Sequence, residues 1–291
     1  MYAGASSTKW ALLDSSRSVV ASGRTPPLSG HVFTPEQQEQ NFAALEVLIA
    51  ALGQNRPQKA VAGITGLGMG DAAAQFYQQA LLEVFALQDV AVMSDMDLAY
   101  LAHFEPGEGI LVYGGTGGIA FHLRPDGSPV RAGGRGYLIA DPGGGFSLGQ
   151  RLLEFVTTQM DLSDTPEQHP LAAAVFAQVG GSNQWAVLRE HVYMGGHAAV
   201  AAFAPLVGQV YANTRNEDAL RLLEQTGQDM ALLANRLMRR VGVLPIALAG
   251  GVLAVSSQIE HSARVALGGH LEVRVPQLDV ALCAAQMALE L

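Results

Sequence analysis

The residues best suited to chemistry lie between Gly114 and Gly149, where twelve of thirty-six residues are glycine, against 33 in the whole chain of 291. Glycine costs backbone entropy, so a dense cluster in a foldable sequence indicates positive φ angles or the close approach of another group. Backbone N–H groups in such loops, or at a helix start, bind anionic oxygens without basic side chains. The stretch therefore predicts a phosphate-binding loop; a pair of glycine-rich hairpins is the alternative.

Two acidic residues stand at places where chemistry is plausible. Asp141 lies in the turn ADPGGG, where an acid that approaches a helix in a Pro-Gly turn is the structural interpretation. Asp95 ends the apolar strand pattern VAVMSD. Its alternative is structural, because Ser94 as N-cap and Asp97 as the third helical residue would form a capping box and leave Asp95 a first-turn acid.

The elements that position these residues follow one order twice. Residues 1 to about 105 read as strand, strand, strand, helix, strand, helix, strand, and the strand GILVYGG begins the same order again. Further strands are expected at IAFHL, PIALAGG and LEVRV, and helices at 217–241, 256–267 and from Leu278. The pattern predicts a duplicated unit with a cleft between its halves, a natural place for a ligand.

The first helix carries clear end signals. Thr34 suits the N-cap, Pro35 the first turn, Gln37 completes a capping box, and Gly53 ends the helix. A second helix is expected to open at Asp71. The buried stripe of the first helix is predicted to be Phe42, Leu45, Ile49 and Leu52.

Composition excludes several classes of protein. The net charge of −9 and pI near 5.3 argue against a general nucleic-acid or membrane-surface binder. Cys283 is the single cysteine, so one chain forms no disulfide and no multi-cysteine metal site. With no signal-peptide pattern, we expect a cytoplasmic, reducing location. The apolar segment from Ala198 to Leu206 fits a homodimer interface as readily as a core helix.

Five pieces of the sequence carry a family resemblance. In order and spacing, TK at Thr8, SD at Ser94, GILVYGGTGGIAF, GGRGYLIADPGGGFSLG and IALAGGV resemble the BadF/BadG/BcrA/BcrD ATPase family, and most of all its N-acetylglucosamine kinase branch. The resemblance spans nearly the whole chain. It implies an α/β fold of two duplicated RNase H-like domains of the actin-like ATPase type, which we place at residues 1–105 and 106–291, with the final helix able to pack back on the first domain.

The resemblance also implies an activity. It is transfer of the γ-phosphoryl group of ATP, with Mg²⁺, to a hydroxyl of an amino sugar such as N-acetylglucosamine, with ATP and a small sugar as the partners. It assigns proton acceptance to Asp95, and sugar binding to Asp95, Gly134, Arg135, Gly136 and Asp141. It assigns nucleotide binding to Thr8, Lys9, Gly114, Gly115, Thr116, Gly117, Gly118, Gly250 and Gly251.

One departure from the family favours an alternative. Gly4 stands where the first phosphate motif usually has an aspartate that helps to hold hydrated Mg²⁺. Arg135 and Pro142 also depart from the usual sugar-side residues, so the identity of the sugar stays open. The alternative function is a non-catalytic or weakly active nucleotide and sugar sensor. The dehydratase-activating branch of the family needs two cysteines from each subunit, which a single cysteine does not supply.

Overall fold

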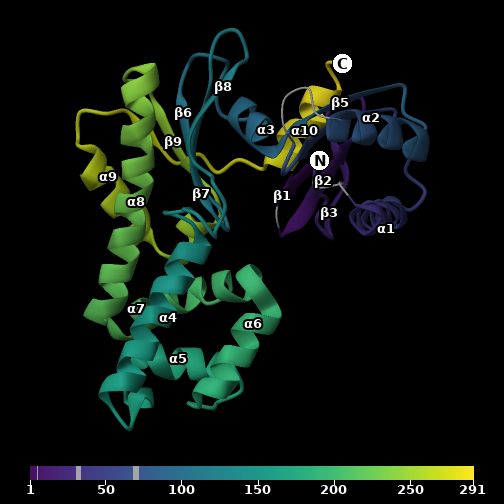
Figure 1. Ribbon diagram of the computed structural model, residues 1–291. Coiled ribbons are helices and arrows are strands. Elements are labelled where there is room, and N and C mark those ends of the chain that lie inside the picture. Colours follow the sequence, from purple (N-terminus) through teal and green to yellow (C-terminus); the bar gives the residue numbers. More distant parts are fainter. Residues whose placement is uncertain (5, 31–33, 68–71) are drawn as a thin grey trace. The chain divides into compact units, whose positions relative to one another are not determined.

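The computed structural model describes residues 1–4, 6–30, 34–67 and 72–291 (Figure 1). Its contacts divide these residues into two compact units. Unit 1 comprises residues 1–105 and 277–291, and unit 2 comprises residues 106–276. The predicted domain limits, residues 1–105 and 106–291, stay a prediction. Asp71, where the second helix was expected to open, lies outside the described residues.

Unit 1 is built on a five-stranded mixed sheet with the order β3-β2-β1-β4-β5. The strand β2 is antiparallel to both β1 and β3, whereas β4 runs parallel to both β1 and β5. The strands are β1 (Tyr2–Gly4), β2 (Ser7–Leu13), β3 (Val19–Thr25), β4 (Lys59–Ile64) and β5 (Asp89–Ser94).

Helices cover both faces of this sheet. On one face, α1 (Pro35–Leu52) and α2 (Ala72–Phe85) form a buried cluster in which Leu45 and Tyr77 pack with Ile64 of β4. On the other face, α3 (Asp95–Leu101) and α10 (Val280–Ala288) pack against β4. Gly63 is required there, because a Cβ atom at this position would lie 2.6 Å from the side chain of Leu98 in α3.

The end signals of α1 are confirmed, but its predicted stripe was partly wrong. Thr34 is the N-cap of a complete capping box and Gly53 is the C-cap. Leu45 and Leu52 are buried as predicted, whereas Phe42 is exposed and Ile49 is only half-buried. The buried stripe instead follows Asn41, Ala44, Leu45, Leu48 and Leu52. Asn41 takes a core position because its amide oxygen accepts from the Ser29 N–H and its amide nitrogen donates to the Gln37 carbonyl, contacts that an apolar pattern does not reveal.

Unit 2 contains a second five-stranded sheet with the equivalent order, β10-β9-β6-β7-β8. Strand directions repeat as well: β6, β7 and β8 are antiparallel in sequence, and β9 runs parallel to β6 and β10. This repetition confirms the predicted duplication of an α/β unit. The strands are β6 (Ile110–Gly114), β7 (Gly118–Leu123), β8 (Pro129–Gly133), β9 (Ile246–Ala249) and β10 (Val273–Arg274).

The helices of unit 2 lie between its third and fourth strands and after the fourth. The 25-residue helix α8 (Glu217–Val241) packs against β6, β7 and β8, and α9 (Ser257–Leu267) packs against α8. The remaining helical elements are α4 (Gly145–Leu162), η1 (Pro166–Gln168), α5 (Pro170–Gln178), α6 (Trp185–Ala201), α7 (Ala204–Thr214) and η2 (Gly251–Val255).

The apolar segment that begins at Ala198 spans the break between α6 and α7. Val200, Phe203 and Ala204 are buried in the core of unit 2, which favours the core reading for this segment. A homodimer stays a prediction.

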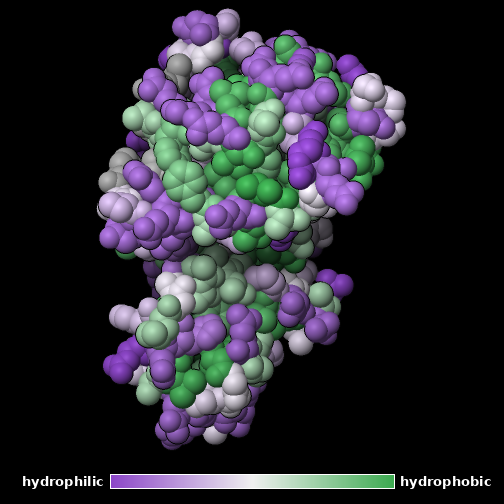
Figure 2. Space-filling view, turned by 90° about the vertical axis from the view of Figure 1, so that its right-hand side faces the viewer, coloured by the Kyte–Doolittle hydropathy of each residue, from purple (hydrophilic) through white to green (hydrophobic). Residues whose placement is uncertain are grey.

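The surface mixes polar and apolar side chains. On the face presented in Figure 2, apolar patches are interrupted by hydrophilic side chains. Such a mixture is normal for folded proteins, because apolar atoms contribute much of every protein surface. Within the described ranges, no helix combines the length and the apolarity needed to cross a membrane.

Candidate functional site

In unit 1, the candidate residues lie at the carboxyl ends of the parallel strands. Ala3 is paired with Ile64, and Ile64 is paired with Ser94. The residues that follow these three are Gly4, Thr65 and Asp95, so they share one edge of the sheet. Ligands of open α/β sheets bind at the carboxyl edge of parallel strands, and this arrangement places Asp95 where such a ligand would lie.

Asp95 has an unusual carboxyl group for an aspartate. Burial raises its pKa to about 6, while hydrogen bonds from the Thr65 side chain and the Met96 N–H oppose the rise and the Asp97 charge adds to it. A group with a pKa near the working pH is a good proton acceptor, because a useful fraction is ionised and the ionised form is still basic. The geometry therefore suits general-base chemistry.

The helix cap beside Asp95 is made by its neighbours. The Ser94 hydroxyl accepts a hydrogen bond from the Asp97 N–H at 3.0 Å and donates one to the Asp97 carboxylate at 2.8 Å. In the expected capping box, the Asp97 carboxylate would accept a hydrogen bond from the Ser94 backbone N–H. In the structure it accepts one from the Ser94 hydroxyl instead. Capping accounts for Asp97 and leaves the Asp95 carboxyl for another role.

Thr8 and Lys9 are adjacent residues in β2, so their side chains lie on opposite faces of the sheet. Thr8 is fully buried, and its hydroxyl accepts a hydrogen bond from the Leu28 N–H at 3.1 Å. Lys9 is exposed. The structure thus gives Thr8 a packing role within unit 1. A phosphate contact by Lys9, or by Thr8 through its backbone, stays a prediction.

A polar network that sequence reasoning missed supports the same edge. The Gly30 N–H donates to the Thr65 carbonyl at 2.7 Å, and the Ser29 N–H donates to Asn41 Oδ1 at 2.8 Å. The buried Tyr77 hydroxyl lies within hydrogen-bond distance of the same Asn41 oxygen and of the Ser29 carbonyl, and its single proton is donated between these two acceptors. The network fixes the segment beside Thr65, and through Thr65 it supports Asp95. Its only sequence signal is Thr65 itself, a polar residue directly after a buried strand.

In unit 2, the Gly114–Gly118 loop sits on the amino end of α4. The N–H groups of Gly145 and Phe146 donate to the carbonyls of Gly115 and Thr116, both at 2.8 Å. Because the C=O and N–H of a trans peptide point in opposite directions, the N–H groups of Thr116 and Gly117 point away from α4. The loop therefore turns these two backbone N–H groups away from α4, on the side of the positive end of the helix dipole.

Several glycines of this loop are needed because other loops touch them. A Cβ on Gly118 would lie 1.8 Å from the Pro142 carbonyl oxygen, and one on Gly144 would lie 2.4 Å from the backbone of Gly117. Gly250, at φ +100°, follows β9 and touches the backbone of Gly114. Gly251 differs, because a Cβ there would meet no atom within 4 Å. Close packing explains the first three, whereas Gly251 leaves open space on its Cβ side.

Asp141 binds the other half of the glycine-rich stretch. Its Oδ1 atom accepts hydrogen bonds from the N–H groups of Arg135 at 2.9 Å and Gly136 at 3.1 Å. Burial raises the pKa of Asp141, and these two N–H groups oppose the rise. Its other oxygen lies beside Gly117. Asp141 therefore joins the segment around Gly134 to the phosphate loop, a role that the sequence did not predict.

The structure brings together the predicted residues of unit 2, where the glycine loops and Asp141 are in contact. In unit 1, Asp95 lies at the carboxyl edge of the sheet, while Thr8 and Lys9 lie in β2 on opposite faces. A sugar-binding or nucleotide-binding role for each residue stays a prediction. Across the described part of the chain, no cluster of three or more His, Cys, Asp or Glu side chains could hold a metal ion. Mg²⁺ commonly takes only one or two carboxylates together with substrate phosphates, so a magnesium site does not require such a cluster.

Comparison with known proteins finds solved structures that resemble this chain. A candidate N-acetylglucosamine kinase from Chromobacterium violaceum has a structure that superposes with a TM-score of 0.76 and 28% identity, over 99% of this chain and 96% of that one. Another from Porphyromonas gingivalis gives 0.75 and 20%, over 97% and 96%. The second likeness concerns the fold alone. Together they confirm the predicted α/β fold class with two RNase H-like units.

Sequence comparison adds one curated relative and a family. The relative is an N-acetylmuramic acid/N-acetylglucosamine kinase from Clostridium acetobutylicum, 32% identical over 72 residues, which are 25% of this chain and 24% of that protein. The chain thus spans about a quarter of the length of this relative. The model of the BadF/BadG/BcrA/BcrD ATPase family matches residues 3–286, nearly the whole chain. The protein therefore belongs to the BadF/BadG/BcrA/BcrD ATPase family.

Proposed function

We propose that the protein is an ATP-dependent kinase that phosphorylates a hydroxyl group of an amino sugar such as N-acetylglucosamine. The observation that carries the proposal is Asp95, a largely buried carboxyl group with a raised pKa at the carboxyl edge of a parallel sheet. Membership of an ATPase family supports the use of ATP. The amino-sugar class is supported by the names of the relatives from Chromobacterium violaceum and Clostridium acetobutylicum. A cytoplasmic location is part of the proposal.

Asp95 acts in this proposal as the general base. The sugar hydroxyl oxygen forms a bond to the γ-phosphorus while the bond from that phosphorus to the β,γ-bridging oxygen breaks, so the electron pair leaves with ADP. The hydroxyl proton passes to the Asp95 carboxylate and later to water. A positioned base contributes typically about 10²–10⁴-fold to such a step. Thr65 holds the carboxylate in place through its hydrogen bond.

The glycine loops of unit 2 are proposed to position the phosphates and the sugar. The outward N–H groups of Thr116 and Gly117 are suited to phosphate oxygens, and Gly251 leaves space for the flat adenosine. Asp141 keeps the Gly134–Gly136 segment against the phosphate loop, so that its backbone can reach sugar hydroxyls. Mg²⁺, when bound, neutralises negative charge on the phosphates.

The proposal is tested by measuring ADP release across a panel of hexoses and hexosamines. We expect N-acetylglucosamine or a closely related amino sugar to stimulate ADP release well above the rate without sugar. Replacing Asp95 with Asn is expected to lower that rate at least about 10²-fold while nucleotide binding is kept. Saturable binding of nucleotide and sugar without any ADP release would contradict the proposal and indicate a sensor.

A further inference from the structure

Residues 134–141, the sugar segment of the proposed function, form a turn that is closed by its own hydrogen bonds. The N–H groups of Ile139 and Ala140 donate to the Gly136 carbonyl at 3.0 and 3.1 Å. The Asp141 carboxylate accepts a hydrogen bond from the Gly136 N–H at 3.1 Å. These bonds define the shape of the turn, so its place against the helices of unit 2 depends on other contacts.

Tyr137 reaches out of the sugar segment to two helices. Its ring stacks on the His197 ring of α6, with 4.9 Å between the ring centroids and 19° between the ring planes. The same Tyr137 ring packs against Phe146, in the first turn of α4, at 5.2 Å between centroids. The Phe146 N–H donates to the Thr116 carbonyl of the phosphate loop. Tyr137 therefore links the sugar segment to α6 and to the helix that carries the phosphate loop.

A break in α6 directly precedes His197. Gly196 has φ +59° and ψ −149° inside this helix, a conformation that glycine adopts without the strain it causes in other residues. On the amino side of the break, Tyr193 and Met194 are exposed. On its carboxyl side, His197 is half-buried and stacks on Tyr137. The break therefore ends one helical part in solvent and starts a second part with a ring contact to the sugar segment.

The second part of α6 has a rigid support. A Cβ atom on Gly149 of α4 would lie 2.0 Å from the Val200 carbonyl oxygen, so the backbones of the two helices touch there. Val200 is buried in the core of unit 2, and His197 lies about one turn before it in the same helix. Tyr137 therefore stacks on a ring whose backbone is fixed by close packing.

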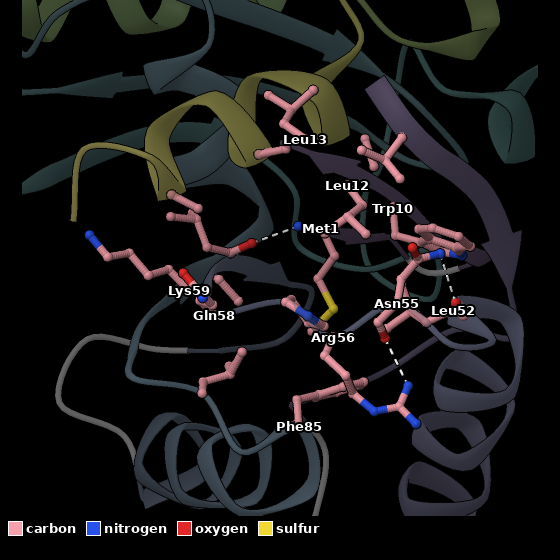
Figure 3. A pocket seen from close by; sticks show the side chains of 18 of the residues that line it. Met1, Trp10, Leu12, Leu13, Leu52, Asn55, Arg56, Gln58, Lys59 and Phe85 are labelled. Atoms are coloured by element: carbon pink, nitrogen blue, oxygen red, sulfur yellow. Dashed lines mark hydrogen bonds between the residues drawn. The ribbon is translucent and has the colours of Figure 1, made fainter. Parts of the chain in front are cut away.

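Unit 1 contains a cavity that is too far from Asp95 to hold the sugar. Its volume is about 560 Å³, and it lies beside Lys59 at the start of β4 (Figure 3). Its lining residues in β4 are 59–61, which stand three to five positions before Ile64. Ile64 is paired with Ser94, the residue before Asp95. At about 3.3 Å per residue the separation is roughly 10–16 Å, whereas a general base acts at about 3 Å from its hydroxyl.

We propose that His197 and Tyr137 are positioning residues, which hold the sugar segment in the conformation that binds the amino sugar. This inference rests on the proposed function. The two rings act on the sugar segment, whereas Asp95 is held by Thr65 and Met96 in unit 1. Loss of the stack is therefore expected to weaken sugar binding, with little change in ATP binding or in the chemical step.

The first test is His197→Ala, with His191→Ala as the matched control. His191 lies in the same helix, is also half-buried, and its ring meets that of Phe203 in the core at 5.5 Å. From the strength of aromatic pairs, His197→Ala is expected to raise the KM for N-acetylglucosamine about threefold to tenfold. The kcat and the KM for ATP are expected to stay within about twofold of the parent. His191→Ala is expected to leave the sugar KM within the same limits.

Two further variants show whether His197 acts through Tyr137. His197→Phe keeps a flat ring and is expected to bring the sugar KM back to within about twofold of the parent. In a Tyr137→Ala background, His197→Ala is expected to add less than about twofold, because its stacking partner is already missing. An equal effect of His197→Ala in the two backgrounds would overturn the proposal.

Hydrogen exchange of the free protein tests the contact without sugar or ATP. The amides of Ile139 and Ala140 are expected to exchange at least about threefold faster in His197→Ala than in the parent or in His191→Ala. Unchanged exchange in His197→Ala, or faster exchange with an unchanged sugar KM, would also overturn the proposal. If the parent releases no ADP with any sugar, the proposed function fails by itself, and the exchange rates still decide whether His197 holds the segment.

Discussion

Asp95 is the residue on which the proposed chemistry depends. Its carboxyl is largely buried and accepts hydrogen bonds from Thr65 and Met96, and burial raises its pKa to about 6. Burial of an ionised carboxylate opposes folding, so Asp95 lowers the free energy of unfolding of the protein when its carboxyl is ionised. Such conflicts between stability and local environment are typical of functional sites.

Asp95→Asn is expected to stabilise the fold above pH 7. The folded-state pKa is raised from 3.8 to about 6. The stabilising effect of the neutral form is therefore present at low pH and lost as pH rises through 6. At one pKa unit per 1.36 kcal/mol, the gain in unfolding free energy above pH 7 is at most about 3 kcal/mol and should shrink towards pH 4. Urea unfolding at pH 4.5 and 8 measures it, with Asp164→Asn as an exposed control; equal effects of the two substitutions would contradict the account.

The pH profile of turnover should report the same group. A general base must be ionised, so kcat/KM is expected to fall tenfold per pH unit below about 6. Thr65→Val removes the hydroxyl that favours the ionised form and should move this limb to higher pH. Thr65→Ser keeps the hydroxyl and should leave the limb near its original position. If valine and serine shift the profile equally, Thr65 does not act through Asp95.

At the scale of elements, periodicity and end signals predicted most of the fold. The limits of α8, the capping box of α1 and the repeated strand order follow from local patterns and were confirmed. Contacts between distant segments could not be predicted, because nothing in a single sequence pairs Gly250 with Gly114 or Thr65 with Asp95. For the same reason the sequence predicted a phosphate-binding loop in the Gly114–Gly149 stretch, but it did not predict that the segments around Gly117, Gly134 and Gly144 pack on one another.

The glycine contacts predict which substitutions damage the fold. Gly118→Ala places a Cβ 1.8 Å from the Pro142 carbonyl oxygen, so the backbone must shift. We expect a loss of about 1–3 kcal/mol in unfolding free energy. Gly269→Ala is the control, because a Cβ there meets no atom within 4 Å, and its effect should stay within about 0.5 kcal/mol. Chemical denaturation compares the two; similar values would show that the close approach is not needed.

Gly251→Ala separates binding from folding. Its Cβ would also meet open space, so stability should change by no more than about 0.5 kcal/mol. If adenosine lies over this turn, the added methyl group occupies part of its place, and the Kd for ATP should rise about tenfold. Calorimetric titration measures that Kd. An unchanged affinity would move the proposed adenosine site away from Gly251.

At the scale of the whole molecule, two units of one topology provide different parts of the proposed activity. Unit 1 contributes the acidic edge with Asp95, and unit 2 contributes the glycine loops with Asp141. Gly4, at the same sheet edge as Asp95, lacks the carboxylate that was expected at a metal-holding position. Gly4→Asp is therefore expected to raise the rate of ADP release several-fold at limiting Mg²⁺, measured against Gly4→Asn; equal rates for the two variants would leave this position without a role in metal binding.

The central claim is phosphoryl transfer to an amino sugar with Asp95 as the base. The most direct measurement is mass spectrometry of N-acetylglucosamine incubated with ATP, Mg²⁺ and either the parent protein or Asp95→Asn. The account predicts a sugar that gains one phosphate group with the parent protein, and at least about 10²-fold less of that product with the variant. No phosphorylated amino sugar from the parent protein, or equal amounts from the two proteins, would contradict it.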